Sequence, residues 1–227
     1  MKRVLMACAA MAGTLAGAAE MTTDKRIAHA ANAVSEIASA AQNGIPRSLL
    51  AKAQCIVIVP GLIKGAFLFG GKYGRGFAMC KKARGWTPPA AVRIEGGSFG
   101  PQLGGSATDL IMLVMNKNGI NHLLTDKFTL GGDIAVVQGA TGQDASANMD
   151  VTLRAAILTY SHAKGLFAGI SLEGATLRTD SGENKKLYGN PMSNRDILDV
   201  KGKVVTPKLA RPLTVALTKL TPAPKPK

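Results

Sequence analysis

The chain has 227 residues, of which 46% are hydrophobic and 4% aromatic, and its formal net charge at pH 7 is +14. This length suffices for one domain with its own core. The positive charge indicates an anionic partner, but so few aromatic residues argue against a single-strand nucleic-acid binder, which needs bases to stack on rings. We expect no nucleic-acid partner.

The first segment, residues 1–19, has the pattern of a secretory signal peptide. Lys2 and Arg3 precede an apolar stretch, and Gly17, Ala18 and Ala19 are the small residues that a signal peptidase requires. The apolar stretch is shorter than the roughly 20 residues that span a bilayer. We therefore expect an exported protein, periplasmic or peripheral on a bacterial membrane.

Removal of that segment leaves two cysteines, Cys55 and Cys80, in an oxidising compartment. Either they form a disulfide or both are small buried side chains in strands, and the sequence leaves both alternatives open. The histidines, His29, His122 and His162, are scattered and lack the spacing of a metal site. We expect no metal and no other cofactor.

The amino-terminal half of the body begins with helices and continues with strands. Residues 24–43 carry one apolar stripe at helical spacing, and Pro46 can open a second short helix that ends near residue 53. Short apolar runs bounded by Gly, Pro or Asn then predict strands at residues 55–59, 66–69, 76–81, 91–94 and 110–115. In the run at 66–69 both faces are apolar, so it is either covered on both sides or in contact with lipid.

The second half mixes turns, strands and helices. Residues 116–119 read as a turn, 120–125 as a short helix, and 151–161 and 166–177 as two strands of a hairpin that turns at 163–165. Helical segments are predicted at 183–188 and 194–199. Leucines at helical spacing predict an amphipathic helix over 209–220, which we expect to pack on the domain rather than lie on a membrane surface. We expect residues 221–227 to form a disordered Pro/Lys tail.

Glycine content points to the shape of the sheet. The chain has 26 glycines, many of them within the predicted strands. Repeated glycines suit bulges and strong curvature. We therefore predict an α+β fold with a curved, mostly antiparallel sheet or small barrel, flanked by N- and C-terminal helices.

Basic residues are segregated from acidic ones in two parts of the chain. Residues 37–93 contain nine Lys or Arg and no Asp or Glu, and residues 200–227 contain seven Lys or Arg and no acid. Such segregation favours an anionic partner. The alternative is a solvated basic face that only keeps the protein soluble.

One short motif suggests an enzyme. Residues 96–100, GGSFG, match the G-x-S-x-G nucleophile elbow, in which a strand turns sharply into a helix behind the serine. Here Pro101, Gly104 and Gly105 follow, and a helix would not form from these residues. We expect Ser98 to be structural, with no catalytic residue, no small-molecule substrate and no enzymatic activity.

Five segments in order resemble one family, the SYLF domain, a lipid-binding module also called the yeast actin-regulator type actin-binding domain. The segments are AQCIVIVP from residue 53, then KGAFLFGGKYGRGF, GWTPPAAVRIEGGSFGPQLGGSATDLIMLVMN, FTLGGDIAVVQGATG and YSHAKGLFAGISLEGATL. The resemblance covers residues 24–220. It implies binding of anionic lipid, since eukaryotic members bind phosphoinositides and some bind actin. The amphipathic helix of the family corresponds to residues 24–43, which are Ala-rich without Trp or Phe, so we expect this helix to pack on the sheet.

The resemblance and the charge together predict non-enzymatic binding of anionic phospholipid at a membrane surface. The alternative is a periplasmic scaffold or protein-interaction module with an acidic partner. The candidate lipid-binding residues are six cations of the basic segment, Lys64, Lys72, Arg75, Lys81, Lys82 and Arg84.

Overall fold

The structure of the protein is a computed structural model, which describes residues 21–39, 44–67, 69–99, 104–139, 155–163, 166–168 and 172–220. The expected signal peptide at residues 1–19 and the expected tail at 221–227 lie outside the described residues, so both stay predictions. The same holds for the side chains of residues 65–69, which include the apolar run that either is covered or contacts lipid.

A curled sheet forms the centre of the molecule. Its strands are β1 (Cys55–Phe67), β2 (Phe69–Cys80), β3 (Ala90–Phe99), β4 (Gly104–Val114), β5 (Lys127–Thr129), β6 (Val136–Gln138), β7 (Ile157–Ala163), β8 (Leu166–Ala168) and β9 (Thr176–Thr179). Their order is β5-β9-β3-β2-β1-β4-β7-β6, with β8 added to β7. All strand pairs are antiparallel except β6 with β7.

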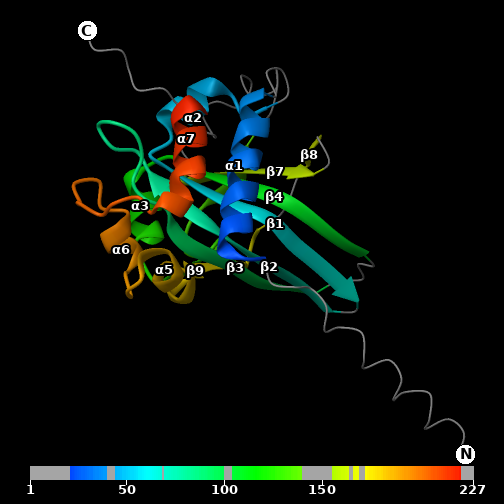
Figure 1. Cartoon of the computed structure of the whole chain (residues 1–227). Helices are drawn as coiled ribbons and strands as arrows, with labels where there is room; N and C mark the ends of the chain where they lie inside the picture. Colours follow the sequence, from blue (N-terminus) through cyan, green and yellow to red (C-terminus); the bar gives the residue numbers. More distant parts are fainter. Residues whose placement is uncertain are drawn as a thin grey trace, which may run out of the picture.

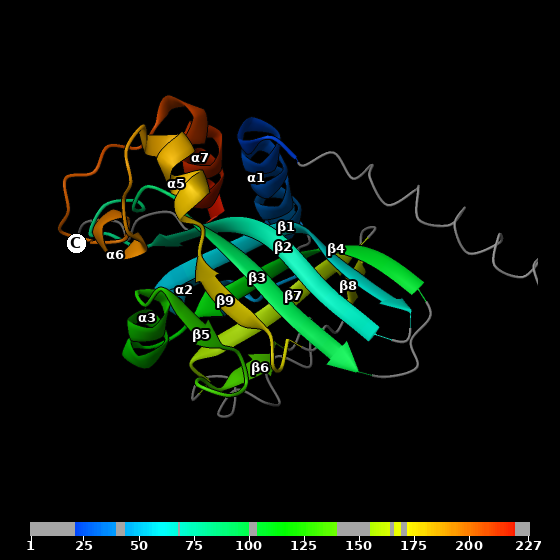
Figure 2. The ribbon, with the colours of Figure 1, turned by 90° about the horizontal axis from the view of Figure 1, so that it is seen from below.

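The sheet curls so far that its two edges approach each other (Figure 2). A single bridge between Leu130, just after β5, and Ile134, just before β6, joins these edges. The result is a half-barrel with an inner face, where the sheet curls over itself, and an outer face covered by helices (Figures 1 and 2). This confirms the predicted α+β class with a curved, mostly antiparallel sheet.

Both faces of the central strands are apolar. Successive side chains of a strand point to opposite faces, so Cys55, Val57 and Val59 of β1 lie in the inner core, whereas Ile56 and Ile58 lie in the outer core. The same alternation along β2, β3 and β4 fills both cores with fully buried side chains.

The two terminal helices cover the outer face. Helices α1 (Thr23–Ser39) and α7 (Arg211–Leu220) lie side by side over the sheet, with α2 (Arg47–Lys52) beyond them (Figure 1). Leu213 and Leu217 of α7 are fully buried in the outer core together with Ile27 and Val34 of α1. This confirms that both helices pack on the domain. Among the described residues, no helix combines the length and the apolar character needed to cross a membrane.

The remaining helices close one end of the sheet. They are α3 (Lys117–Leu123), α5 (Ser181–Tyr188), α6 (Asn194–Ile197) and the 3-10 turn η2 (Lys208–Ala210). Helix α3 begins three residues before the predicted start, because the side chain of Asn116 accepts a hydrogen bond from the Gly119 amide at 3.0 Å and caps the helix. The predicted turn is the first turn of this helix.

Two strand predictions were wrong in extent, and two short strands were missed. The chain reverses between Phe67 and Phe69, which pair with each other, so the predicted strand at 66–69 is a hairpin end. The predicted strand at 166–177 is split into β8 and β9, which lie on distant parts of the sheet. Strands β5 and β6 were not predicted, since three residues carry too little periodicity.

A disulfide joins Cys55 and Cys80. These residues face each other across β1 and β2, at the end of the hairpin that is remote from its turn. The structure thus selects the disulfide from the two alternatives that the sequence left open.

The packing of α7 predicts a large loss of stability on truncation of a buried leucine. Leu213→Ala should lower the free energy of unfolding by about 2–5 kcal/mol, because the substitution leaves a cavity between α7 and the sheet. Leu209→Ala is the matched control. Its side chain is 44% exposed, so a change within about 0.5 kcal/mol is expected. Denaturant unfolding followed by circular dichroism measures both, and equal losses would contradict this packing.

Candidate functional site

The six predicted lipid-binding residues do not form one surface. Lys64 and Lys72 lie near the turn that joins β1 and β2, whereas Lys81, Lys82 and Arg84 follow the other end of β2. Lys81 lies nine positions after Lys72 along an extended strand, which corresponds to about 30 Å. The six residues were predicted to form one site because they are close along the chain.

Lys64 and Lys72 form a pair of cations on the inner face. They are directly opposite each other across β1 and β2. A bulge between Val59 and Leu62, seen where β1 pairs with β4, shifts the alternation of β1, so that Leu62 and then Lys64 point inward. Burial lowers the pKa of Lys72, and the charge of Lys64 lowers it further, while Glu173 opposes the shift. The pair therefore lies within the mouth of the curled sheet rather than on an open face.

Arg75 is held inside the fold by two carboxylates. Its Nε lies 2.6 Å from Asp180 Oδ2, and its second terminal nitrogen lies 3.0 Å from Glu183 Oε2. Arg26 of α1 binds the other oxygen of Glu183 at 2.8 Å. Burial lowers the pKa of Arg75, but the hydrogen bond and charge of Asp180 and the charge of Glu183 raise it by more. This network ties β2 to α1 and α5.

Lys81 points toward helix α2. Its Nζ donates hydrogen bonds to the carbonyls of Leu50 at 2.7 Å and Ala51 at 2.8 Å, and lies 5.7 Å from the centre of the Trp86 ring. Burial lowers the pKa of Lys81. A cation at this position satisfies the free carbonyls of a helix C-terminus, so its contacts are structural.

Arg93 and Arg178 lie opposite each other across β3 and β9 on the outer face. Glu95 lies between them, with one oxygen 2.7 Å from Arg93 Nε and the other 3.1 Å from a terminal nitrogen of Arg178. Their charge is therefore partly compensated within the protein.

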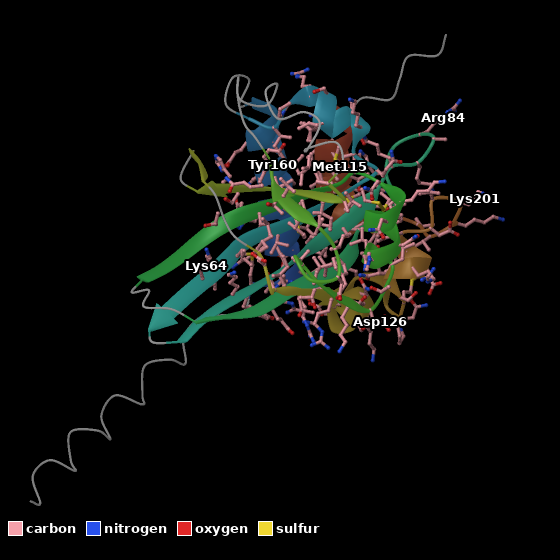
Figure 3. The ribbon with its side chains drawn as sticks, turned by 180° about the vertical axis from the view of Figure 1, so that it is seen from behind. Lys64, Arg84, Met115, Asp126, Tyr160 and Lys201 are labelled. Carbon is pink, nitrogen blue, oxygen red and sulfur yellow. A yellow bond between two sulfur atoms is a disulfide. The ribbon has the colours of Figure 1, made fainter. Side chains whose placement is uncertain are left out.

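Lys82 and Arg84 belong to a different group, which the fold completes from the C-terminal segment. Lys82 Nζ donates a hydrogen bond to the Gly202 carbonyl at 3.4 Å, which places Lys201 and Lys203 beside the loop between β2 and β3. Arg84, Lys201 and Lys203 are exposed, and Arg84 and Lys201 project from the same side of the molecule (Figure 3). We call Lys82, Arg84, Lys201 and Lys203 the basic surface.

The basic surface carries an excess of positive charge. The carboxylate of Asp199 lies beside it and accepts a hydrogen bond from the Lys201 amide at 3.0 Å. Within the described part of the chain, none of its four cations forms an ion pair, in contrast to Arg75, Arg93 and Arg178. Apolar side chains accompany it, since Val200 is 45% and Val205 is 80% exposed. Exposed cations without ion pairs, next to exposed valines, suit an anionic surface with an apolar interior.

Sequence reasoning missed Lys201 and Lys203 as site residues. The signal was present, because both acid-free segments contribute to the basic surface. Nothing in the sequence indicates that these segments meet, since well over one hundred positions separate Lys82 from Lys201.

Ser98 does not occupy a nucleophile elbow. It lies within β3, paired with Gly70 of β2. Strand β3 continues through Ser98 to Phe99, and the next element among the described residues is strand β4 from Gly104, whereas an elbow needs a helix directly behind its serine.

The fold is that of a small α+β domain, and comparison with known proteins identifies its family. Residues 95–220 match the model of the Ysc84 family, described as Las17-binding protein actin regulator, and the chain belongs to this family. This confirms the SYLF resemblance at the level of the family.

The chain is similar to several eukaryotic proteins. It is 34% identical over 177 residues to an SH3 domain-containing protein of Schizosaccharomyces pombe, covering 76% of this chain and 40% of that protein. It is 31% identical over 173 residues to Protein YSC84 of Saccharomyces cerevisiae, with 74% and 36% covered. It is 32% identical over 179 residues to SH3 domain-containing YSC84-like protein 1 of Bos taurus, with 78% and 52% covered. The chain thus spans about half or less of the length of these curated relatives.

The contacts of Arg75 predict a structural role that its neighbour in sequence, Arg84, does not share. Arg75→Gln should lower the free energy of unfolding by about 3 kcal/mol or more, because Asp180 would remain buried without its cation. Arg84→Gln should change it by less than about 0.5 kcal/mol, since Arg84 is exposed. Urea unfolding compares the two variants, and similar values for both would show that the ion pair contributes nothing.

Proposed function

We propose that the protein binds anionic phospholipid membranes, without catalysis, through the basic surface. The observation that carries the proposal is the lack of ion-pair partners for these cations among the described residues, next to exposed Val200 and Val205. Cations that are paired with carboxylates inside the fold, such as Arg75, attract an anionic ligand only weakly.

The energetics suit reversible attachment to a membrane. Each Lys or Arg close to an anionic bilayer contributes about 1 kcal/mol, so four of them acting together support useful affinity. The exposed valines can enter the headgroup region and add a hydrophobic contribution. Because the basic surface is exposed, salt screens its attraction, with a Debye length of about 10 Å at 0.1 M that falls to about 3 Å at 1 M.

Several features support the proposed location and the lack of catalysis. The pattern of residues 1–19 supports export, and the Cys55–Cys80 disulfide is of a kind that persists in oxidising compartments. We therefore place the protein at the surface of a bacterial membrane that faces such a compartment. The position of Ser98 inside a strand supports binding rather than hydrolysis.

An acidic protein is the second candidate ligand. The family description, Las17-binding protein actin regulator, names protein partners for relatives of this chain. The same cations would attract acidic side chains, while the exposed valines beside them can also enter the apolar region of a membrane surface. Lipid remains the ligand that we favour.

Vesicle co-sedimentation tests the proposal. The variant replaces Arg84, Lys201 and Lys203 with Gln, and should bind phosphatidylglycerol-containing vesicles at least tenfold more weakly at low salt, because about 1 kcal/mol is lost for each cation. A matched control replaces Lys25, Lys127 and Lys185, which are exposed elsewhere, with Gln and removes the same charge. Its affinity should fall by less than threefold.

Equal weakening of both variants would show that only net charge matters and would overturn the basic surface. Binding of the unmodified chain to polyglutamate but not to vesicles would favour an acidic protein partner instead. Circular dichroism of each variant verifies that the fold is retained.

A further inference from the structure

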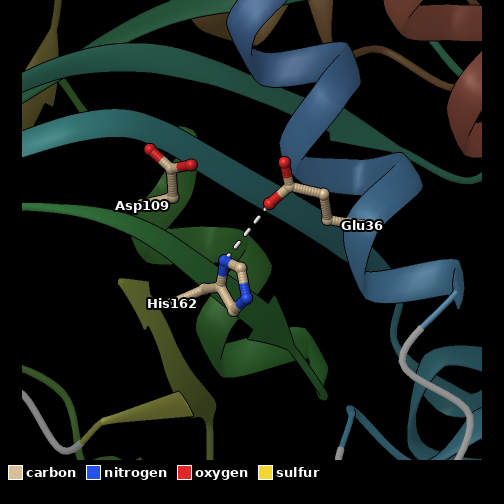
Figure 4. A group of neighbouring side chains, drawn as sticks. All are labelled: Glu36, Asp109 and His162. Atoms are coloured by element: carbon tan, nitrogen blue, oxygen red, sulfur yellow. Dashed lines mark ion pairs between the residues drawn. The ribbon is translucent and has the colours of Figure 1, made fainter. Parts of the chain in front are cut away.

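Three potential metal ligands converge beneath helix α1. Glu36 comes from α1, Asp109 from β4 and His162 from β7, and their side chains point toward one another (Figure 4). One ligand atom of each residue lies within 4.8 Å of those of the other two. His162 Nδ1 is 3.3 Å from Glu36 Oε2.

The fold brings these residues together from three distant parts of the sequence. Asp109 and His162 are directly opposite each other across β4 and β7. They share the outer face with Ile111 and Tyr160, which occupy the same alternating positions and lie in the outer core. Helix α1 crosses this face, so Glu36 is held above the two strand residues.

A fourth residue orients the group. His29 lies seven positions before Glu36, two helical turns away on the same side of α1. Its Nε2 is 3.2 Å from Asp109 Oδ1, and the Gly61 amide donates a hydrogen bond to the same oxygen at 2.7 Å. Contacts of this kind fix the direction of a ligating carboxylate and are typical of residues behind a metal ligand.

The distances fit a small divalent ion. Bonds of about 2.0–2.1 Å in a tetrahedron place neighbouring ligand atoms about 3.3 Å apart. Glu36 and His162 already have this spacing. The other spacings do not exceed 4.8 Å, so each has to shorten by about 1.5 Å at most. Glu36 can supply that movement, because its side chain is 56% exposed on the helix surface.

We propose that Glu36, Asp109 and His162 bind a divalent transition-metal ion of the Zn²⁺ type, with His29 positioning Asp109. Two carboxylates balance the charge of the ion, and an imidazole nitrogen favours Zn²⁺ over Ca²⁺ or Mg²⁺, which prefer oxygen ligands. A fourth ligand position is left for water. The bound ion would fasten α1 to β4 and β7, independently of lipid binding.

The ordinary alternative is that these residues only form ion pairs that hold α1 on the sheet. Isothermal titration calorimetry with ZnCl2 separates the two readings. The experiment uses the full chain without a polyhistidine tag, stripped of metal with a chelator and dialysed. Saturable binding of one Zn²⁺ per chain and a raised Tm with Zn²⁺ are expected.

Three variants locate the site. Glu36→Gln and His162→Gln should each weaken Zn²⁺ binding by at least tenfold. His122→Gln, in α3 beside Phe128 and distant from the site, should leave it unchanged. Glu36 is exposed, so its substitution retains the fold even where that of His162 does not. Absence of saturable 1:1 binding, or unaltered binding by Glu36→Gln, would overturn the proposal.

Discussion

Two apolar faces on the same central strands constrain the whole molecule. Side chains of β1 alternate between the inner and the outer core, and both sets are removed from water. A sheet of this kind needs cover on each side. Helices α1, α2 and α7 supply the outer cover, while the inner face is covered by curling the sheet until β5 and β6 approach each other. The glycines and the bulge between Val59 and Leu62 allow this curvature.

The same constraint decides which charges remain available. Arg75 projects from the outer face where α1 and α5 pack, so a charge there is tolerated only with Asp180 and Glu183 beside it. Charged side chains in the loops at the end of the sheet stay in water and need no ion-pair partner. Arg84 and Lys201 lie in loops and keep their charge for solvent or a ligand. Burial thus distinguishes the cations that hold the fold together from the candidate binding cations. The sequence alone does not separate the two groups, because both consist of Lys and Arg in acid-free segments.

Helix α1 makes other contacts besides those that cover the sheet. Its buried stripe packs on the sheet and on α7, Arg26 joins the ion-pair network with Glu183, and Glu36 reaches His162. An amphipathic helix held by three kinds of contact is not free to leave the domain and insert into a membrane. The proposed membrane attachment would therefore involve the loops at the end of the sheet rather than α1.

The sequence by itself determined the local elements and the character of the domain. An apolar stripe at helical spacing predicts α1, the leucines of 209–220 predict α7, and alternating apolar runs predict the cores of the long strands, because these signals depend only on neighbours along the chain. Long-range pairing was decided by the tertiary structure alone. Splitting β8 from β9, placing Lys201 beside Lys82 and setting Glu36 over His162 all follow from strand register and helix packing. Strand register and helix packing depend on how both apolar faces of the sheet are covered at the same time. A pattern of neighbouring residues carries no information about this.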